Sequence, residues 1–579
     1  MTNHDKLTDA ERVLVEIWQQ VLEVDTVGID DDYFDLGGDS IHAIVIVARA
    51  RAAGVDVAAQ DLFSARTIRE VIATVPQDPA GDLPPKQREP EREPITDHPL
   101  TPLQHGMLYH ALERDSPDAY LVQVCCRLVG ELDAAAFAAA WQLVFQANPA
   151  LRTVLRWSGQ QHPRQLFPPG LRMPIEVVDH SGLALDELQA AFARLAEADR
   201  RLGFDLERGP LIRLTLVAEG PAAHRCVLTH HHLVLDGWSQ QLLLGDVFDC
   251  YQQLKTGMPA TCRSRPPYRD YLDWLADLPG VDETYWRSLL GGVSPTHVAP
   301  VGCRSAEPPA GPRSQAERRL SGPLIRSLVE FTRKHGVTPG AIVHGGWALL
   351  LGIQVDRDDV VFGSTVSGRP PQLPGAMECV GLFVNTLPVR VVVRPDASAV
   401  DWLREIQQDL VVLRENQHLT LGAIERAVGR PGGVGLFDTL VVVENFPAWL
   451  REGDEIAGLR IEELATVVEE SYPLVVEFAP GAEPVLRMRY DRRQLDSPTV
   501  HSGLDALVAY LECVLADPQC RLDALRDRIA ARWRTDLDAN RRTARSQAES
   551  ALGTVSRRPV DAVPPTGHDI DRRPMSERA

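Results

Sequence analysis

Three consecutive histidines stand just before an Asp-Gly pair in LTHHHLVLDGWSQ, residues 228–240. In an extended segment, His230 and His232 point to one face and His231 to the other. An imidazole, whose ordinary pKa is near 6.5, can accept a proton from a reacting amine. Metal binding is a second interpretation, with Asp236 as a further ligand, but no other His, Cys or Glu cluster stands at a supporting spacing. Packing without a function is the third interpretation.

A serine in a glycine-rich turn is the second feature that could carry chemistry. Ser40 follows Gly37, Gly38 and Asp39 in DLGGDSIHA and opens a predicted helix. The two glycines allow a tight turn, which would expose the serine at a corner. A phosphate attached there would lie beside the positive end of the helix. The alternative is that Asp39 or Ser40 only caps the helix.

Ser40 lies in an acidic, helical first unit. Residues 1–78 contain 15 Asp and Glu against 6 Lys and Arg. DAERVLVEIWQQVLEV has apolar residues at helical spacing, and SIHAIVIVARARAAG reads as a second helix that ends at Gly54. Residues 79–98 follow with five prolines and no apolar run, which predicts an extended linker.

The histidines lie in a larger unit of mixed helices and strands. Residues 99–534 alternate between the two patterns, which predicts an α/β architecture. A unit of this size should divide into two lobes, and we place the break after YRDYLDWLADLPG, giving 99–275 and 276–534. Residues 535–579 are polar and rich in arginine, and we expect them to be disordered.

Composition excludes several classes of protein. The net charge of −20 argues against a nucleic-acid partner, because phosphate binding needs a basic face. No apolar run approaches a membrane span, and the charged start does not resemble a signal peptide. The nine cysteines show no C-x-x-C spacing, which argues against a disulfide framework or a zinc ribbon. These features predict a reduced, cytoplasmic protein, which we expect to be a monomer.

The first unit resembles the peptidyl carrier proteins of nonribosomal peptide synthetases. DDYFDLGGDSIHAIVIVARAR matches their motif of Gly-Gly-(Asp/His)-Ser followed by an apolar residue. The resemblance implies a small four-helix bundle with 4′-phosphopantetheine attached covalently to Ser40 by a phosphopantetheinyl transferase. The thiol of that group would hold an aminoacyl or peptidyl thioester.

The larger unit resembles condensation domains, which have a two-lobed α/β fold like that of chloramphenicol acetyltransferase. HHLVLDG matches their His-His-x-x-x-Asp-Gly motif, and other segments match further motifs in the expected order. These segments are PLTPLQHGMLYHAL, NPALRTVL, YRDYLDWL, VGLFVNTLPVR, LFDTLVVVENFP and SYPLVVEFAPG. Two residues depart from the usual pattern: His105 stands where many relatives have a glutamate, and Asn148 where a histidine is usual.

The resemblance implies roles for individual residues. His232 would be catalytic, as a base or by positioning the amine, and His231 structural. Asp236 would be structural as well, in an ion pair with Arg152. The backbone N–H of Gly237 is our candidate donor to the negative charge that develops on the thioester oxygen.

The implied reaction is peptide-bond formation at the junction of two lobes. The amine of an aminoacyl acceptor would attack the acyl or peptidyl thioester carried on Ser40, which upstream synthetase domains supply. The acceptor carrier would belong to another part of the synthetase, and the donor would be D-configured or glycine. Segments 364–375 and 441–450 resemble elements that cross the cleft, and Arg369 and Pro370 there would be structural.

Other functions share this fold. Epimerization domains carry the same histidine motif, but they add a Glu-Gly-His-Gly-Arg-type segment, which we do not find. Heterocyclization domains replace the histidines with aspartates, which are absent at this position. A non-catalytic recruitment platform would have a degraded motif, whereas this motif is intact. The last alternative is that only the carrier unit functions.

Overall fold

The computed structural model describes most of the chain, with gaps. The described residues are 7–22, 24–38, 40–57, 61–62, 65–74, 97–114, 120–157, 163–278, 283–298, 313–430, 435–444, 450–469, 471–481 and 483–555. Nearly all of the predicted linker, residues 79–98, lies outside them, as do residues 556–579 of the predicted tail.

The first unit is a small helical bundle around a buried aromatic pair. Its described helices are α1 (Asp9–Leu22), α2 (Ser40–Ala52) and α4 (Ile68–Thr74), with helical residues also at 61–62. The amphipathic pattern of α1 puts Leu14 and Trp18 in the core. Trp18 meets the ring of Tyr33 edge-on at 5.3 Å between centroids. This core fixes the turn that leads into α2.

The first lobe is built on a six-stranded sheet in the order β12-β13-β2-β7-β6-β5. Its strands are β2 (Leu121–Val129), β5 (Ile175–Asp179), β6 (Ile212–Gly220), β7 (Ala223–His231), β12 (Glu455–Ile456) and β13 (Leu459–Val468). Its helices are α5 (Pro102–Arg114), α6 (Ala134–Ala147), α7 (Leu185–Leu202), α8 (Gly237–Lys255) and α9 (Tyr268–Ala276). The apolar faces of α6 and α8 share one core with the sheet, so two helices hold the strand that carries the histidines.

A three-stranded sheet adjoins the first lobe in the order β1-β4-β3. Its short strands are β1 (His98–Pro99), β3 (Val154–Arg156) and β4 (Arg164–Leu166), and the 3-10 helix η1 (Pro149–Arg152) precedes β3. Gln104 of α5 links this sheet to the histidine loop, because its Nε2 donates to Gln165 and to the Leu233 carbonyl.

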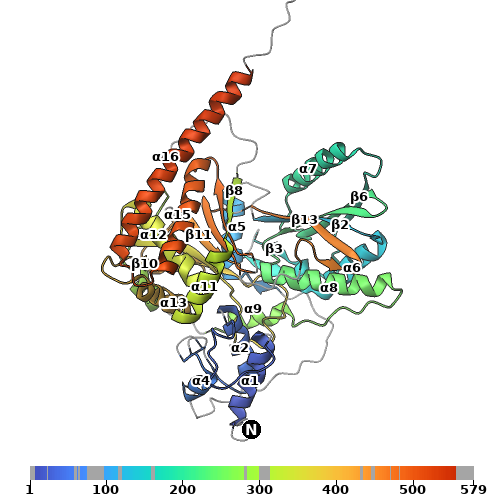
Figure 1. Cartoon of the computed structure of the whole chain (residues 1–579). Helices are drawn as coiled ribbons and strands as arrows, with labels where there is room; N and C mark the ends of the chain where they lie inside the picture. Colours follow the sequence, from blue (N-terminus) through green and yellow to red (C-terminus); the bar gives the residue numbers. More distant parts are fainter. Residues whose placement is uncertain are drawn as a thin grey trace, which may run out of the picture.

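The second lobe has another six-stranded sheet, in the order β10-β9-β11-β14-β15-β8. Its strands are β8 (Arg313–Arg319), β9 (Asp359–Val366), β10 (Asn385–Val392), β11 (Thr439–Val443), β14 (Leu474–Ala479) and β15 (Val485–Asp491). Its helices are α10 (Glu283–Leu290), α11 (Gly322–His335), α12 (Pro339–Val355), α13 (Ala399–Glu415), α14 (Leu421–Ala427), α15 (Ser497–Ala516) and α16 (Leu522–Val555). Figure 1 shows the two lobes side by side.

The predicted division at residue 275 is wrong for one segment. Strands β12 and β13 come late in the chain, yet they extend the first lobe's sheet, where Ile461 pairs with Leu128 of β2. Leu459 and Ile461 are buried in the first lobe's core, so their apolar face is the physical reason for the crossing. Figure 1 shows β13 beside β2.

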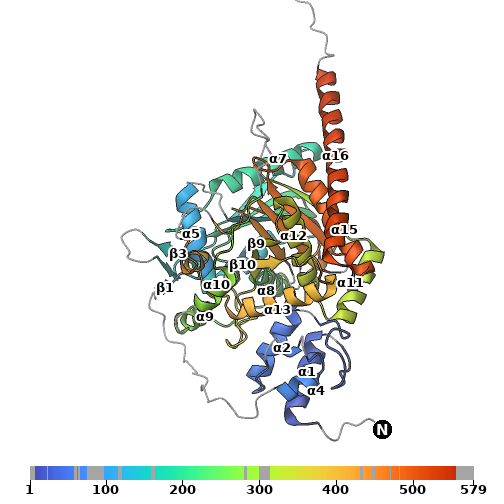
Figure 2. The same cartoon turned by 90° about the vertical axis from the view of Figure 1, so that its left-hand side faces the viewer.

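The predicted disorder after residue 535 is also wrong up to Val555. Helix α16 continues to that residue and begins with Leu525 and Ile529 buried against the second lobe. Further along, Asn540 Nδ2 donates to Ser502 Oγ of α15 at 2.8 Å. These contacts anchor a helix whose low apolar content had suggested disorder, and Figure 2 shows it extending away from the lobes.

Two segments of the described chain are apolar enough to span a membrane by length and composition. One is α15, and the other is α11 together with α12, which are bent by 105°. Over half of the apolar window of α15 is buried, and Leu504 and Leu507 lie fully in the second lobe's core. Packing inside the lobe therefore accounts for the apolar character of α15.

The first unit contacts the second lobe at α11. Arg333 Nε lies 3.1 Å from Asp35 Oδ1, and Arg66 Nη2 donates to the Arg333 carbonyl at 2.8 Å. Figures 1 and 2 both show the first unit beside this lobe. Asp35, which pairs with Arg333, is one of the acidic residues that give this unit its negative charge.

Candidate active site

The serine motif has the backbone that the glycines predict. Gly37 has a φ of +88°, which favours glycine. A Cβ on Gly38 would lie 2.4 Å from the Tyr33 ring, so the second glycine is required by close packing. Ser40 is the first residue of α2, a helix of 13 residues, although its side chain lies outside the described atoms. A hydroxyl at this helix start fits the attachment of a phosphate ester.

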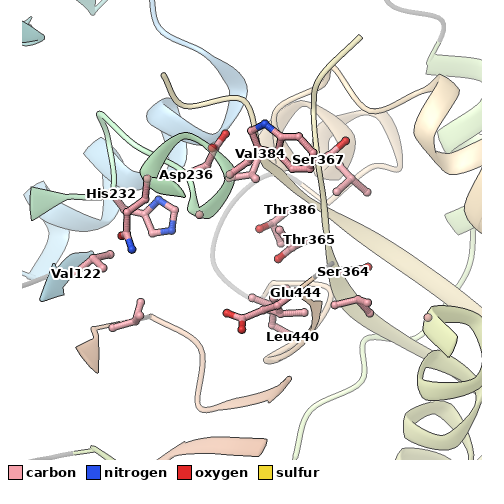
Figure 3. Close-up of a pocket in the computed structure, with 18 of the residues that line it drawn as sticks. Val122, His232, Asp236, Ser364, Thr365, Ser367, Val384, Thr386, Leu440 and Glu444 are labelled. Atoms are coloured by element: carbon pink, nitrogen blue, oxygen red, sulfur yellow. The ribbon is translucent and has the colours of Figure 1, made fainter. Parts of the chain in front are cut away.

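A cavity of about 680 Å³ lies between the two lobes. Its walls come from the histidine loop and α8 on one side and from β8, β9, β11 and β15 with their flanking segments on the other. Lining residues that enter the argument below are His230, His232, Asp236, Gly237, Ser364, Thr365, Ser367, Arg369, Glu444, Arg487 and Arg489. A cavity of this size can hold a drug-sized molecule. Figure 3 shows side chains from both walls pointing into it.

Alternation along β7 sorts the three histidines as predicted. His230 and His232 line the cavity, whereas His231 is not among its described lining residues. His230 is buried, with Nε2 3.1 Å from Gln240 Oε1 and Nδ1 3.2 Å from the His231 carbonyl. Burial lowers the pKa of His230 to about 4, which the hydrogen bond with Gln240 partly opposes. His230 is therefore uncharged at neutral pH.

His231 points away from the cavity into the first lobe. Its Nδ1 accepts a hydrogen bond from the Leu233 backbone N–H at 3.1 Å, and its own N–H donates to the Leu211 carbonyl at 2.9 Å. The side chain therefore stabilises the turn that follows β7.

His232 is the first residue after β7 and faces the cavity. Its backbone N–H donates to the Tyr120 carbonyl at 2.8 Å, which holds the loop against the start of β2. Tyr120 Oη in turn lies 2.8 Å from Ser471 Oγ, in the segment that enters β14. Figure 3 shows the His232 imidazole at the cavity wall. The arrangement leaves this ring on the side where a substrate would lie.

Asp236 caps helix α8 and joins the two lobes. Its Oδ1 accepts from the Ser239 N–H at 2.7 Å, and its Oδ2 accepts from the Phe383 N–H at 3.0 Å. Its ion-pair partner is Arg369, with Nη2 to Oδ1 at 3.1 Å. Both side chains are almost fully buried, at 0% and 1% exposure. Asp236 thus ties the loop of the first lobe to the second.

The predicted ion pair between Asp236 and Arg152 is wrong. Arg152 lies in η1, just after the end of α6, and donates to two backbone carbonyls instead. Nη1 reaches the Gln146 carbonyl at 2.6 Å and Nε reaches the Pro168 carbonyl at 3.1 Å. The last carbonyls of a helix lack partners within the helix, and a nearby arginine satisfies them. Arg152 therefore closes α6, and Arg369 takes the position on Asp236.

Arg369 has the structural position expected of it. Its Nη1 donates to the Cys379 carbonyl at 2.9 Å, and its guanidinium lies 4.1 Å from the centroid of the Phe383 ring. The preceding Gly368 has a φ of +63°, and a Cβ there would lie 1.7 Å from the Phe383 carbonyl. The close packing at Gly368 fixes the backbone from which Arg369 reaches Asp236.

Gly237 begins α8 and lines the cavity. Its position at the positive end of a helix agrees with a role as a hydrogen-bond donor to negative charge. That role stays a prediction.

The two departures from the family pattern lie in α5 and at the end of α6. Asn148 ends α6, where its Nδ2 donates to the Val144 carbonyl at 2.9 Å. His105 lies in α5. Neither is found among the described residues that line the cavity.

The second lobe contributes charged residues that the sequence did not bring together. Glu444 follows β11, Glu477 lies in β14, and Arg487 and Arg489 lie in β15. Glu477 is fully buried, and Arg489 Nη1 lies 2.9 Å from its Oε2. A glutamate inside the apolar strand LVVEFA was the available signal. The described residues contain no group of three or more His, Cys, Asp or Glu that could hold a metal.

Comparison with known families gives two matches. A model described as the condensation domain matches residues 95–526, and a model described as the phosphopantetheine attachment site matches residues 12–75. The chain belongs to the condensation-domain family. The second match identifies residues 12–75 as a carrier unit and supports phosphopantetheine as its cofactor.

Curated relatives of this condensation domain belong to peptide synthetases. The chain is 34% and 33% identical to two subunits of the linear gramicidin synthase of Brevibacillus parabrevis, over 76% and 74% of its length. It is 30% identical to chondramide synthase of Chondromyces crocatus over 75% of its length. The chain spans only 9%, 6% and 12% of the length of these relatives, respectively.

Solved structures of similar shape support the fold. The starter condensation domain of rhizomide synthetase has a TM-score of 0.62 at 20% identity, covering 74% of this chain and 97% of that one. The first condensation domain of the calcium-dependent antibiotic synthetase has a TM-score of 0.62 at 20% identity, covering 74% and 98%. The predicted two-lobed condensation fold is confirmed.

Proposed function

We propose that the chain forms peptide bonds in nonribosomal peptide synthesis. The amine of an aminoacyl acceptor attacks the acyl or peptidyl thioester delivered by the carrier unit. The observation that carries this proposal is the position of His232, at the wall of a cavity shared by both lobes, within an intact histidine motif. Relatives over the condensation domain are parts of peptide synthetases, in agreement with this reaction.

Each residue of the site has its own role in the proposed reaction. His232 accepts or shares the proton that the amine loses. The N–H of Gly237 donates to the thioester oxygen as negative charge develops there. Asp236 and Arg369 hold the start of α8 against the second lobe, so that these groups keep their spacing. When bound, phosphopantetheine on Ser40 supplies the thiol that carries the donor.

The partners of this reaction follow from the same proposal. A phosphopantetheinyl transferase modifies Ser40, upstream domains supply the donor, and a separate aminoacyl carrier presents the acceptor. The monomeric state, the cytoplasmic location, the absence of a nucleic-acid partner and the absence of a membrane partner stay predictions. So does the preference for a D-configured or glycyl donor, for which equal or faster turnover of an L-donor would be contrary evidence.

Intact-mass spectrometry of both carriers tests the proposal. The chain is converted to its pantetheinyl form with an acyl group attached and mixed with an aminoacyl carrier protein. The acyl mass should leave this chain and appear on the acceptor, and Ser40→Ala should not load. Loading of Ser40 without transfer to a panel of acceptors would contradict the proposed peptide-bond formation. It would favour a recruitment platform, or a chain in which only the carrier functions.

The epimerization alternative predicts a different product. It requires the second acid or base that a Glu-Gly-His-Gly-Arg-type segment supplies, and we find no such segment in the sequence. In heavy water, an epimerase would introduce deuterium at the α-carbon of the donor. We expect transfer without deuterium incorporation, and exchange without transfer would favour epimerization.

A further inference from the structure

Glu444 lies on the cavity wall opposite His232. It comes directly after β11, and its backbone N–H donates to the Phe478 carbonyl of β14 at 2.9 Å, which continues the strand pairing. Figure 3 shows the Glu444 carboxyl pointing into the space between the two walls. The sheet therefore fixes the backbone of this residue and directs its side chain to the substrate space.

A buried partner stands behind Glu444. Glu477 of β14 is fully buried and contacts Arg487, its strand partner on β15, as well as Arg489. Glu444 follows the strand next to β14, and the negative charge of Glu477 acts on its carboxyl. Arg487 and Arg489 pair with the Glu477 carboxylate.

The protonation of Glu444 agrees with this arrangement. Burial, and next the negative charge of Glu477, raise the pKa of Glu444 to about 8, against the opposing effect of Arg489 and Arg487. At neutral pH the carboxyl is therefore mostly protonated, and an approaching cation would favour its ionisation.

Other charged or titratable groups also face this space. Besides Arg487 and Arg489, they are His230 of β7, His232, Asp236, Arg369, Glu317 and Arg319 of β8, His344 of α12, Arg414 of α13, and the phenols of Tyr120 and Tyr472. Burial lowers the pKa of His344 to about 4, so this histidine is uncharged at neutral pH. Glu317 and Arg319 lie on the outermost strand, with side chains 43% and 68% exposed, and are screened by solvent.

The chemistry of the acceptor matches the Glu444 side of the cavity. An aminoacyl thioester carries an α-ammonium group that must enter the cavity before it can lose a proton. We propose that Glu444 is a positioning residue that binds the ammonium of the aminoacyl acceptor, on the wall opposite His232. This inference rests on the proposed function, because that function makes an amine the acceptor.

Binding then has a defined proton balance. The O–H bond of Glu444 breaks, its proton goes to solvent, and the resulting carboxylate pairs with the ammonium. An acceptor without a positive charge gives no such release. The ammonium, held between the two walls, next loses its own proton to the imidazole of His232.

Calorimetric titration in two buffers of different ionisation enthalpy measures this release without turnover. The probe is a stable aminoacyl-pantetheine amide at pH 7, and its N-acetylated form is the uncharged control. Wild type should release protons with the amine probe only. Glu444→Gln should abolish the release and weaken binding of the amine probe by roughly tenfold or more, the loss of one charge-assisted hydrogen bond. Binding of the acetylated probe should not change.

Glu131→Gln is the matched control for the substitution, because this glutamate is exposed on the first lobe, away from the cavity. It should release protons as wild type does. The inference is overturned if Glu444→Gln releases as many protons as wild type and binds the amine equally well, or if wild type binds neither probe. Transfer without proton release would reject the inference alone, and proton release without transfer would reject the proposed function alone.

Discussion

The two walls of the cavity differ in charge and in how they are built. The first lobe contributes His230 and His232 from one continuous stretch, packed by neighbouring hydrogen bonds. The second lobe contributes Glu444, which follows β11, and the residues behind it from β14 and β15. In the proposed function, His232 on the first wall takes up a proton, and Glu444 on the second wall holds a cation.

This difference also sets how each wall responds to pH. Burial makes a histidine harder to protonate and a carboxyl harder to ionise. Acid therefore destabilises the first wall, because buried His230 stays uncharged at a pH where the same histidine in the unfolded chain takes up a proton. A rising pH destabilises the second wall, because buried Glu444 keeps its proton at a pH where the same glutamate in the unfolded chain has lost it. The Asp236–Arg369 pair holds the two walls together.

The largest expected effect comes from breaking that connection. Arg369→Met leaves the Asp236 carboxylate buried without its cation, and the free energy of unfolding should fall by about 3–5 kcal/mol. A double-mutant cycle of Arg369→Met with Asp236→Asn, measured by denaturant unfolding, should show strong coupling between the two residues. The same cycle with Arg152→Met should show almost none. Stronger coupling of Asp236 to Arg152 would contradict the structure.

The second prediction concerns the alkaline side. Since the folded pKa of Glu444 is about 8, above that of an unfolded glutamate, its contribution to stability is fully present below the unfolded pKa. The contribution is lost as pH rises through about 8, with a slope of at most about 1.4 kcal/mol per pH unit. Glu444→Gln should flatten the stability curve between pH 5 and 8, to about this extent. An unchanged slope would argue that Glu444 ionises normally.

The third prediction is the acid counterpart on the first wall. His230 has a folded pKa of about 4, below the unfolded value of 6.5. Its stabilising contribution is present above pH 6.5 and is lost as pH falls toward 4, amounting to about 3 kcal/mol at most. His230→Gln keeps a polar side chain near Gln240 and should reduce the loss of unfolding free energy between pH 6.5 and 4. If this loss, measured by denaturant unfolding from pH 4 to 7, is the same as in wild type, the prediction is contradicted.

Sequence reasoning succeeded where function is contained in a short stretch. Local backbone geometry predicts that His230 and His232 face one side and His231 the other. It also predicts the tight turn at the glycines before Ser40. It failed where contacts link distant strands. Arg369 lies 133 positions from its partner Asp236. The expected partner, Arg152, came from the family resemblance, and in the structure it donates to the Gln146 carbonyl instead.

The same limit explains the errors in the fold. Strands β12 and β13 join the first lobe, held by the apolar face of β13, although the strands on either side of them in sequence, β11 and β14, belong to the second. Helix α16 has few apolar residues, but those at its start, such as Leu525 and Ile529, pack against α15. Composition describes a segment alone, and these segments are ordered by partners that only the folded chain brings near.

The smallest expected effect is at the contact between the carrier unit and α11. The side chains of Arg333 and Asp35 are 52% and 53% exposed, so their ion pair should contribute at most about 1 kcal/mol. Arg333→Ala should loosen the carrier in a salt-dependent way without changing the unfolding of either lobe. Fluorescence energy transfer between probes on the carrier unit and α11, compared at low and high salt, measures this effect. No difference between the variant and wild type at low salt would contradict it.

The central claim is that His232 serves the chemical step. The most direct measurement is the single-turnover rate constant for transfer from Ser40-bound donor to an aminoacyl carrier, in wild type and in His232→Ala. The ring faces the cavity, so the substitution should leave Ser40 loading and the free energy of unfolding unchanged. The rate constant should fall by about 10²–10⁴-fold, the range for loss of a general base. A rate constant within about threefold of wild type, with loading intact, would contradict the account, because a loss that small is far below that range.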